Sequence, residues 1–214
     1  MVSEARQIEI RDCYGDTLVV CFAPQRMAPA AALVSGLALA GIDLEGARLH
    51  AADLYWADLD QAILRGAVLT RADMRGVRAT AADFTDAELN LVSLSPDNIG
   101  GPADCTRARF VRANLRGAKM QGAVLRKADL SGADLREADL GPSRFGGTAD
   151  LSGAILTGAR LQNTRLKGAI YDDQTVFPRG FQPRAAGMIM NRRGTILRGA
   201  EPRDAEPWVH RISG

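Results

Sequence analysis

The side chains that could carry catalysis or bind a metal are few and widely separated. The 214-residue chain has two histidines, His50 and His210, and three cysteines, Cys13, Cys21 and Cys105. General acid–base and nucleophilic catalysis need a partner group that tunes the reactive side chain, and zinc needs clustered ligands such as a CxxC pair. The sequence has neither spacing, and it has no phosphate-binding or dinucleotide motif. We therefore expect no catalytic residue, no metal and no cofactor.

Carboxylates are numerous, but they recur with a fixed spacing. Asp53, Asp58, Asp129 and Asp134 each stand directly before a leucine. A general acid needs a distinctive environment that shifts its pKa, and a regular row of solvated carboxylates provides none. Their expected role is structural. The odd, widely spaced cysteines favour a reduced cytoplasmic protein, and no apolar run approaches the roughly 20 residues of a membrane span.

The elements that hold these residues are defined by a five-residue repeat. Apolar centres, large apart from Ala79, recur at every fifth position from 39 to 99, from 105 to 145 and from 151 to 171. Of the 27 centres 18 are Leu, and 20 of the residues two positions earlier are Ala. A period of five would spiral around a helix and would alternate between the faces of a strand. The conflict disappears if the chain turns a corner in every pentad and winds into a coil.

The A-D-L-x-x pattern, as in Ala128-Asp129-Leu130-Ser131-Gly132, resembles the pentapeptide-repeat family. This resemblance implies an all-β fold, a right-handed quadrilateral β-helix with four pentads per coil, about seven coils and a length of about 30 Å. Residues 20 apart should stack, so Leu44, Leu64 and Phe84 form one inner column. The same core contains Leu125, Leu130 and Leu135.

The ends of the coil need covers, because an open end exposes unpaired backbone. We divide the chain into an N-terminal cap (1–36), the β-helix (37–171) and a C-terminal cap and tail (172–214). Residues 6–23 are typical of a β-hairpin, and residues 27–36 are expected to form a short helix. The segment from 169 resembles a closing segment of cyanobacterial members of the family, with a second short helix. The residues from 189 onward are expected to be a polar tail.

The repeat slips by one residue at two related sequences. They contain the candidate bulges Gly100, Gly101 and Pro102, and Gly146, Gly147 and Thr148. At both sites a polar residue, Asp97 or Ser143, replaces the alanine two positions before the centre. Two interpretations are open: a tolerated one-residue insertion, or a kink that shapes a docking face.

Charge is unevenly distributed along the chain. Residues 1–100 carry 8 basic and 14 acidic side chains, and residues 101–214 carry 19 and 11. If the slips leave the order of the faces unchanged, one face gathers a candidate basic docking stripe: Arg107, Arg126, Lys127, Arg144, Arg165 and Lys167. It is either a solvated surface or a site for an anionic partner.

These features favour a non-enzymatic interaction or structural scaffold of the bacterial cytoplasm, monomeric or weakly dimeric, with an unknown protein partner. The first alternative is a DNA-mimicking modulator of DNA gyrase, an activity that the family resemblance implies. The basic stripe and the positive total charge of +2 argue against mimicry along the whole length. The second is nucleic-acid binding through the stripe, which lacks interleaved aromatic residues for base stacking.

Overall fold

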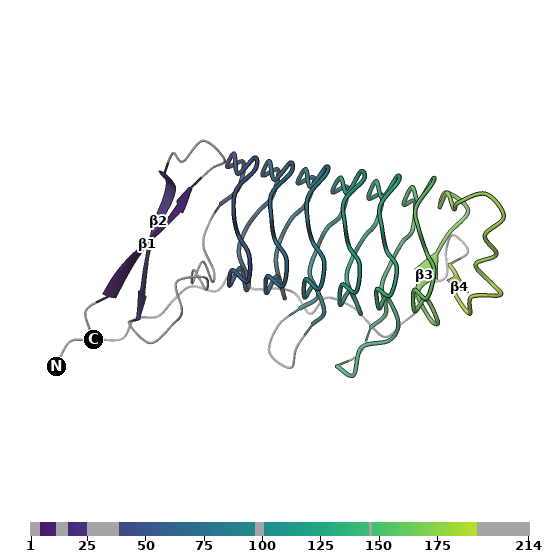
Figure 1. The fold of residues 1–214 in the computed structure, drawn as a ribbon. Helices are drawn as coiled ribbons and strands as arrows, with labels where there is room; N and C mark the ends of the chain where they lie inside the picture. Colours follow the sequence, from purple (N-terminus) through teal and green to yellow (C-terminus); the bar gives the residue numbers. More distant parts are fainter. Residues whose placement is uncertain (1–4, 12–16, 25–38, 97–100, 146, 192–214) are drawn as a thin grey trace.

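The described residues between 39 and 171 form an elongated coil that winds around a single axis (Figure 1). A computed structural model describes residues 5–11, 17–24, 39–96, 101–145 and 147–191. Successive coils are joined by isolated parallel β-bridges between residues at the same position, for example Asp43 with Ile63 and Ile63 with Asp83. Each coil has four short straight segments, and these form the four sides of the rod.

Each pentad turns a corner immediately after its centre residue. The amide of Ala47 donates a hydrogen bond to the carbonyl oxygen of Leu44 at 3.0 Å, which closes a β-turn over Glu45 and Gly46. The third turn residue has positive φ, 65° at Gly46 and 58° at Trp56. That backbone conformation reverses the chain direction, so each centre and each preceding Ala can point to the common axis.

Hydrogen bonds between coils hold the stack together. The amide of Leu44 donates to the carbonyl oxygen of Ile63 at 2.7 Å, and the amide of Ile63 donates to the carbonyl oxygen of Ile42 at 2.9 Å. This register stacks Leu44, Leu64 and Phe84 in one column, and all three are fully buried. Leu125, Leu130 and Leu135 are buried in the same core. The core is therefore a continuous aliphatic column, in which Phe84 and Phe110 stack with ring centroids 4.9 Å apart.

The two interruptions shift the register by six residues, not by one. Ser93 bridges Lys119, and Asp139 bridges Arg165, so stacked residues lie 26 apart where they lie 20 apart elsewhere. Each site thus adds one pentad and one extra residue to the regular separation of 20. In that pentad a polar residue, Asp97 or Ser143, stands at the alanine position, where burial of a polar side chain would be costly. The expectation of one-residue bulges is wrong. Phe145, expected as a core centre, is 42% exposed.

Of the expected bulge residues, Gly101, Pro102, Gly147 and Thr148 belong to these longer excursions, and Gly100 and Gly146 lie outside the described residues. The counterpart centre Ile99 also lies outside them. Because each jump adds a pentad, counting pentads along the sequence assigns the outward residues beyond position 96 to the wrong side of the rod.

At the N-terminal end, β1 (Ala5–Arg11) pairs with β2 (Thr17–Pro24) in antiparallel register, with an irregularity between Ile10 and Arg11. These strands match the hairpin predicted for residues 6–23, and they lie beyond the first coil in Figure 1. The expected helix at 27–36 lies outside the described residues.

At the C-terminal end, β3 (Ile170–Tyr171) pairs in parallel with β4 (Ile189–Met190). Ile189 and Met190 were assigned to the polar tail, but they add a further bridge to the coil. Phe177 and Phe181 stack at 5.2 Å between ring centroids and pack against the core. The short helix expected here is absent from the described residues 172–191, which contain turns, the bridge residue Val176 and β4.

Candidate functional site

One side of the rod carries both loops, and we call it the groove face. It contains the stacked residues Asp53, Asp73, Ser93, Lys119, Asp139 and Arg165. The first insertion in the repeat, 96–102, follows Ser95 of this face, and the second, 142–148, follows Gly141. Ser95 and Gly141 occupy the same corner position two coils apart, so both insertions begin at one edge, and Figure 1 shows the second loop below the rod.

The second loop is closed by its own hydrogen bonds. The amide of Ser143 donates to the carbonyl oxygen of Gly147 at 2.9 Å, and the amide of Phe145 donates to the Ser143 hydroxyl oxygen at 3.1 Å. Gly147 has φ of 78°, a conformation that favours glycine. The Arg144 guanidinium lies 4.6 Å from the centroid of the Phe145 ring. The loop thus presents a cation and an aromatic ring together.

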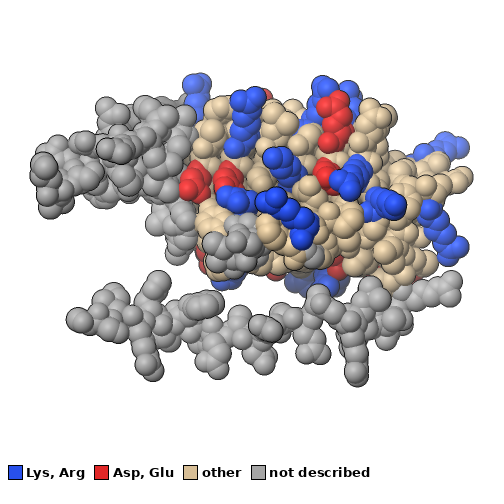
Figure 2. All heavy atoms as spheres, turned by 90° about the horizontal axis from the view of Figure 1, so that it is seen from below, with Lys and Arg blue, Asp and Glu red and all other residues tan. Residues whose placement is uncertain are grey.

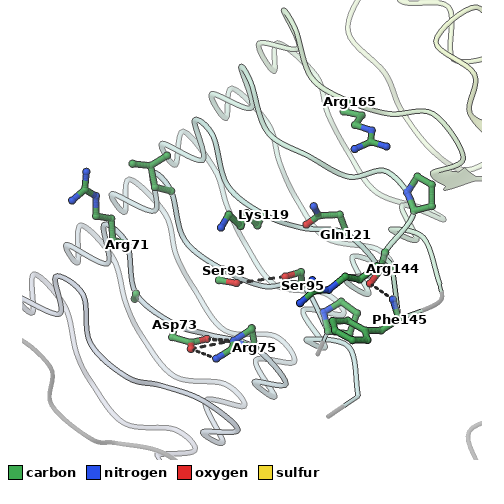
Figure 3. Close-up of a pocket in the computed structure, with 15 residues that line it drawn as sticks. Arg71, Asp73, Arg75, Ser93, Ser95, Lys119, Gln121, Arg144, Phe145 and Arg165 are labelled. Carbon is green, nitrogen blue, oxygen red and sulfur yellow. Dashed lines mark hydrogen bonds and ion pairs between the residues drawn. The ribbon is translucent and has the colours of Figure 1, made fainter. Parts of the chain in front are cut away.

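The groove face, Pro96 and the second loop line an open groove of about 760 Å³. Figure 3 shows its lining, which runs from Arg71 on one edge to the loop residues Arg144 and Phe145 on the other. Short side chains, including Ser93 and Ser95, form part of the floor. The hollow therefore arises because small floor residues lie beside a loop that the coil has expelled.

Cations dominate the lining of the groove. Five cationic side chains face it, against the single carboxylate of Asp73; the cations are Arg71, Arg75, Lys119, Arg144 and Arg165. Figure 2 shows the same side of the molecule, on which Lys and Arg side chains gather along the middle. A cluster of like charges at a concave surface attracts an anionic ligand.

Two of these cations are engaged by carboxylates and two are not. Arg75 pairs with Asp73, with Nη2 2.6 Å from Oδ2, and Arg165 lies 3.2 Å from an oxygen of Asp139. Arg71 and Lys119 are exposed and form no ion pair with any residue that the structure describes. Their charge is available to a ligand.

The six residues of the predicted basic stripe fall into two groups. Arg144 and Arg165 line the groove, and Lys167 occupies the corner beside Arg165. Arg107, Arg126 and Lys127 occupy the next corner around the coil, after the centres Cys105 and Leu125. The prediction that all six share one face is wrong, because the six-residue jump places Leu151, not Phe145, above Leu125.

Sequence reasoning missed Arg71, Arg75 and Lys119 as neighbours of Arg144. The signal was present in Asp97 and Ser143, which stand where the coil requires a small apolar residue. If these two pentads are left out of the count of coil positions, Lys119 and Arg165 fall on the same side of the rod.

The repeating aspartates have a structural role at the corners. Asp53 Oδ1 accepts a hydrogen bond from the amide of Tyr55 at 3.1 Å, and Asp129 Oδ1 accepts one from the amide of Ser131 at 3.0 Å. The residue before each centre thus satisfies the amide that follows the centre, in the manner of an Asx-turn. This contact explains why Asp recurs there.

Ion pairs between coils reinforce the sides of the rod. Asp83 lies 2.7 Å from Arg65 and 3.6 Å from Arg109, on the two neighbouring coils. Burial by itself raises the pKa of Asp83, but hydrogen bonds from Thr85 and Arg65 outweigh it and leave this pKa below its usual value. The carboxylate is therefore held ionised as a tie between three coils.

Among the described residues we find little that could support catalysis or metal binding. His50 is exposed at a corner, and burial raises the pKa of the Cys105 thiol to about 12. The part of the chain that the structure describes contains no group of three or more His, Cys, Asp or Glu placed to hold a metal ion. Nor does that part contain a helix of the length and apolar character needed to cross a membrane.

Comparison with solved structures finds pentapeptide-repeat proteins. The chain is 30% identical to Rfr23 from the cyanobacterium Cyanothece 51142, over 49% of this chain and 63% of that one, with a TM-score of 0.42. It is 30% identical to HetL from Nostoc sp. strain PCC 7120, a protein involved in heterocyst differentiation regulation. That match covers 72% of this chain and 70% of HetL, with a TM-score of 0.38.

QnrB1, a plasmid-mediated fluoroquinolone resistance protein, is 19% identical over 72% of this chain and 77% of its own, with a TM-score of 0.35. The match to Rfr23 spans less than two thirds of the length of that protein. Comparison with curated protein sequences gives no significant match.

The family itself is established by the repeat. Residues 32–66, 64–95, 103–141 and 149–170 match the family profile "Pentapeptide repeats", in eight copies. The unmatched intervals 96–102 and 142–148 are the two insertions across which the separation of stacked residues rises from 20 to 26. This agreement of profile, period and stacking shows that the chain belongs to the pentapeptide-repeat family, whose members fold as right-handed quadrilateral β-helices.

Proposed function

We propose that the protein is a non-enzymatic interaction scaffold that docks a partner protein in the groove between its two loops. The observation that carries this proposal is the groove beside the second loop, at the edge where both insertions begin, with cations that form no ion pair among the described residues. A coil that expels six residues twice, at the same corner, builds a concave surface that a regular solenoid lacks. Concave surfaces with convergent polar groups are the usual sites of recognition.

The exposed aromatic ring of the second loop supports the same proposal. Phe145 is 42% exposed and Leu91, on the opposite edge of the groove, is 47% exposed. Large apolar side chains beside Arg are common anchors of protein interfaces. The groove therefore offers an apolar contact at either edge and cations between them.

The surface charges favour docking over mimicry of DNA. A DNA mimic for gyrase would present rows of unneutralised carboxylates. In the N-terminal coils the carboxylates of Asp58 and Asp60 are both paired with Arg78, and Asp83 is paired with Arg65 and Arg109. An assay of gyrase supercoiling should accordingly be unaffected by this protein.

The proposal also assigns capping roles to the two ends, residues 1–36 and 172–214. Phe177 and Phe181 support it at the C-terminal end, because they pack against the last core residues. Truncation before Asp172 should then cause association through the exposed coil.

Affinity capture from a lysate of the source organism tests the docking function. The bait is the full chain, and it is compared with a variant that lacks residues 142–147 and carries Thr148→Gly. The control bait carries Arg107→Glu and Lys127→Glu, at an edge away from the groove. A partner held by the native and control baits and lost by the loop variant supports the proposal. Equal retention by all three baits, or no selective retention by any, contradicts it.

A further inference from the structure

Resting on the docking function above, we propose that the groove binds a short, extended acidic peptide segment that bears one bulky apolar side chain. Arg71, Lys119 and Arg144 supply the positive charge, and Phe145 and Leu91 supply the apolar contacts. The recognised feature is an Asp- or Glu-rich stretch of a partner protein, not a small anion and not a nucleic acid.

The length of the groove fits a peptide of this kind. From Asp73 to Arg165 the groove face rises through four coil-to-coil steps. At the usual spacing of about 4.8 Å between bridged strands, these steps span about 19 Å. An extended peptide of about six residues has the same length, at about 3.3 Å per residue. The site is too long for a single phosphate and too short for a long polyanion.

The surroundings of the groove exclude a long polyanion. On the N-terminal side the groove face continues with Asp53, which bridges Asp73 directly. A strand of nucleic acid that extended past the groove in that direction would bring its phosphates toward these two carboxylates. A short acidic segment ends before it reaches Asp53, and Asp73 is already paired with Arg75, so the pattern of charge favours a ligand whose own charge is confined to one stretch.

The aromatic ring also favours a peptide over stacked bases. One face of Phe145 is covered by the Arg144 guanidinium at 4.6 Å. This contact removes one of the two ring faces on which a base could stack, whereas an aliphatic or aromatic side chain can also pack against the ring edge. A carboxylate of the same peptide would then lie near Arg144, so both ligand features are satisfied by one loop.

The two cations without ion partners should determine affinity. Arg71 lies on one edge of the groove and Lys119 lies in the middle of the groove face, between Ser93 and Asp139 in register. Neither needs to break an ion pair among the described residues in order to bind a carboxylate. Reversing both charges should weaken binding about ten-fold or more, since exposed charge pairs contribute modestly and their repulsion adds to the loss.

The experiment measures fluorescence anisotropy of a labelled peptide of alternating glutamate and serine with one central phenylalanine. The full-length protein is compared with the variant Arg71→Glu/Lys119→Glu, and with Arg107→Glu/Lys127→Glu as a control of the same residue types and charge change. Circular dichroism verifies that both variants are folded. A second probe replaces the glutamates with glutamine, and a third is a single-stranded oligothymidine.

The expected result is binding of the acidic peptide to the native and control proteins, a loss of about ten-fold or more in the groove variant, and no binding of the glutamine peptide. Phe145→Ser should weaken binding several-fold without changing its salt dependence. Equal weakening in both double variants, tighter binding of oligothymidine, or no binding of the acidic peptide overturns the proposal. The last result leaves the docking function standing if the capture experiment still identifies a loop-dependent partner.

Discussion

Ser93 and Lys119 occupy the same position on adjacent coils although 26 residues separate them in sequence. Everywhere before the first loop the corresponding separation is 20, as for Asp73 and Ser93. The six additional residues do not distort the stack: the amide of Lys119 still donates to the carbonyl oxygen of Val92 at 2.8 Å, as in regular coils. The loops are therefore additions to a complete solenoid, and the solenoid should not need them.

Removal of the second loop should leave the fold intact. Deletion of residues 142–147 joins Gly141 to residue 148 and restores the spacing of a regular pentad, with Leu140 as its centre. Thr148→Gly supplies the residue that a corner with positive φ favours. We expect an unchanged far-UV circular dichroism spectrum and a melting temperature equal to or above that of the native protein. A deletion of only 142–146, which breaks the period, is the matched control and should lower the melting temperature.

The corner geometry predicts a stabilising substitution at Ala81. Its φ is 58°, a conformation that costs a residue with a Cβ about 1–2 kcal/mol. Ala81→Gly removes that cost but adds about 0.4–1 kcal/mol of unfolded-state entropy. The net gain should be about 0.5–1 kcal/mol in the free energy of unfolding, measured by urea denaturation. The neighbouring Ala82 is buried in the core, so Ala82→Gly should destabilise the protein instead.

Acid should remove the contribution of the Asp83 tie. Because the pKa of Asp83 is lowered in the folded state, its contribution is fully present above the ordinary value of 3.8 and is lost as the pH falls through the folded pKa. Asp83→Asn should cost about 1–2 kcal/mol at neutral pH, and this difference from the native protein should shrink below about pH 3.8. Urea melts at a series of pH values test this.

Asp129→Asn is the control for that series. Asp129 has the same place in its pentad and accepts the amide of Ser131 at 3.0 Å, and the structure shows no ion pair for it among the described residues. A loss for Asp83→Asn that stays constant down to the lowest pH would contradict the charge-based account.

The stacked rings in the core predict a large loss on truncation. The rings of Phe84 and Phe110 are stacked in parallel with centroids 4.9 Å apart, and both side chains are buried. Phe84→Ala should cost about 3–5 kcal/mol through lost burial and the cavity left behind. Phe84→Leu, which installs the residue found at most centres, should cost about 1–2 kcal/mol. Equal losses for the two substitutions would show that the column does not pack as described.

The coil itself could be predicted from sequence because one rule governs both its period and its burial. Leu44 and Leu64 stack because each pentad repeats the same inward pair, so counting in steps of 20 reproduces their contact. The count fails after Ser95, because a pentad that leaves the coil still has the length and the apolar centre of one that stays. Phe145 has the residue type of a centre, and the only sequence signal that it lies outside the core is Ser143, two positions earlier.

The groove could not be predicted for the same reason. Leaving one inserted pentad out of the count places Lys119 and Arg165 on the same face, and it separates Arg144 from Lys127. The C-terminal helix was expected from the resemblance to a closing segment of cyanobacterial members of the family, but Pro178, Gly180 and Pro183 divide the segment into pieces too short for regular helix, and turns form instead.

Site-specific photo-crosslinking tests the docking groove most directly. A photoreactive phenylalanine analogue is placed at Phe145 in the second loop or at Ile155, an equally exposed apolar residue on another face at 40%. Both proteins are irradiated in a lysate of the source organism. We predict that a discrete protein adduct forms from position 145, that the Arg71→Glu/Lys119→Glu substitutions abolish it, and that position 155 does not give it. Adducts of equal yield and identity from both positions would contradict a docking site between the loops.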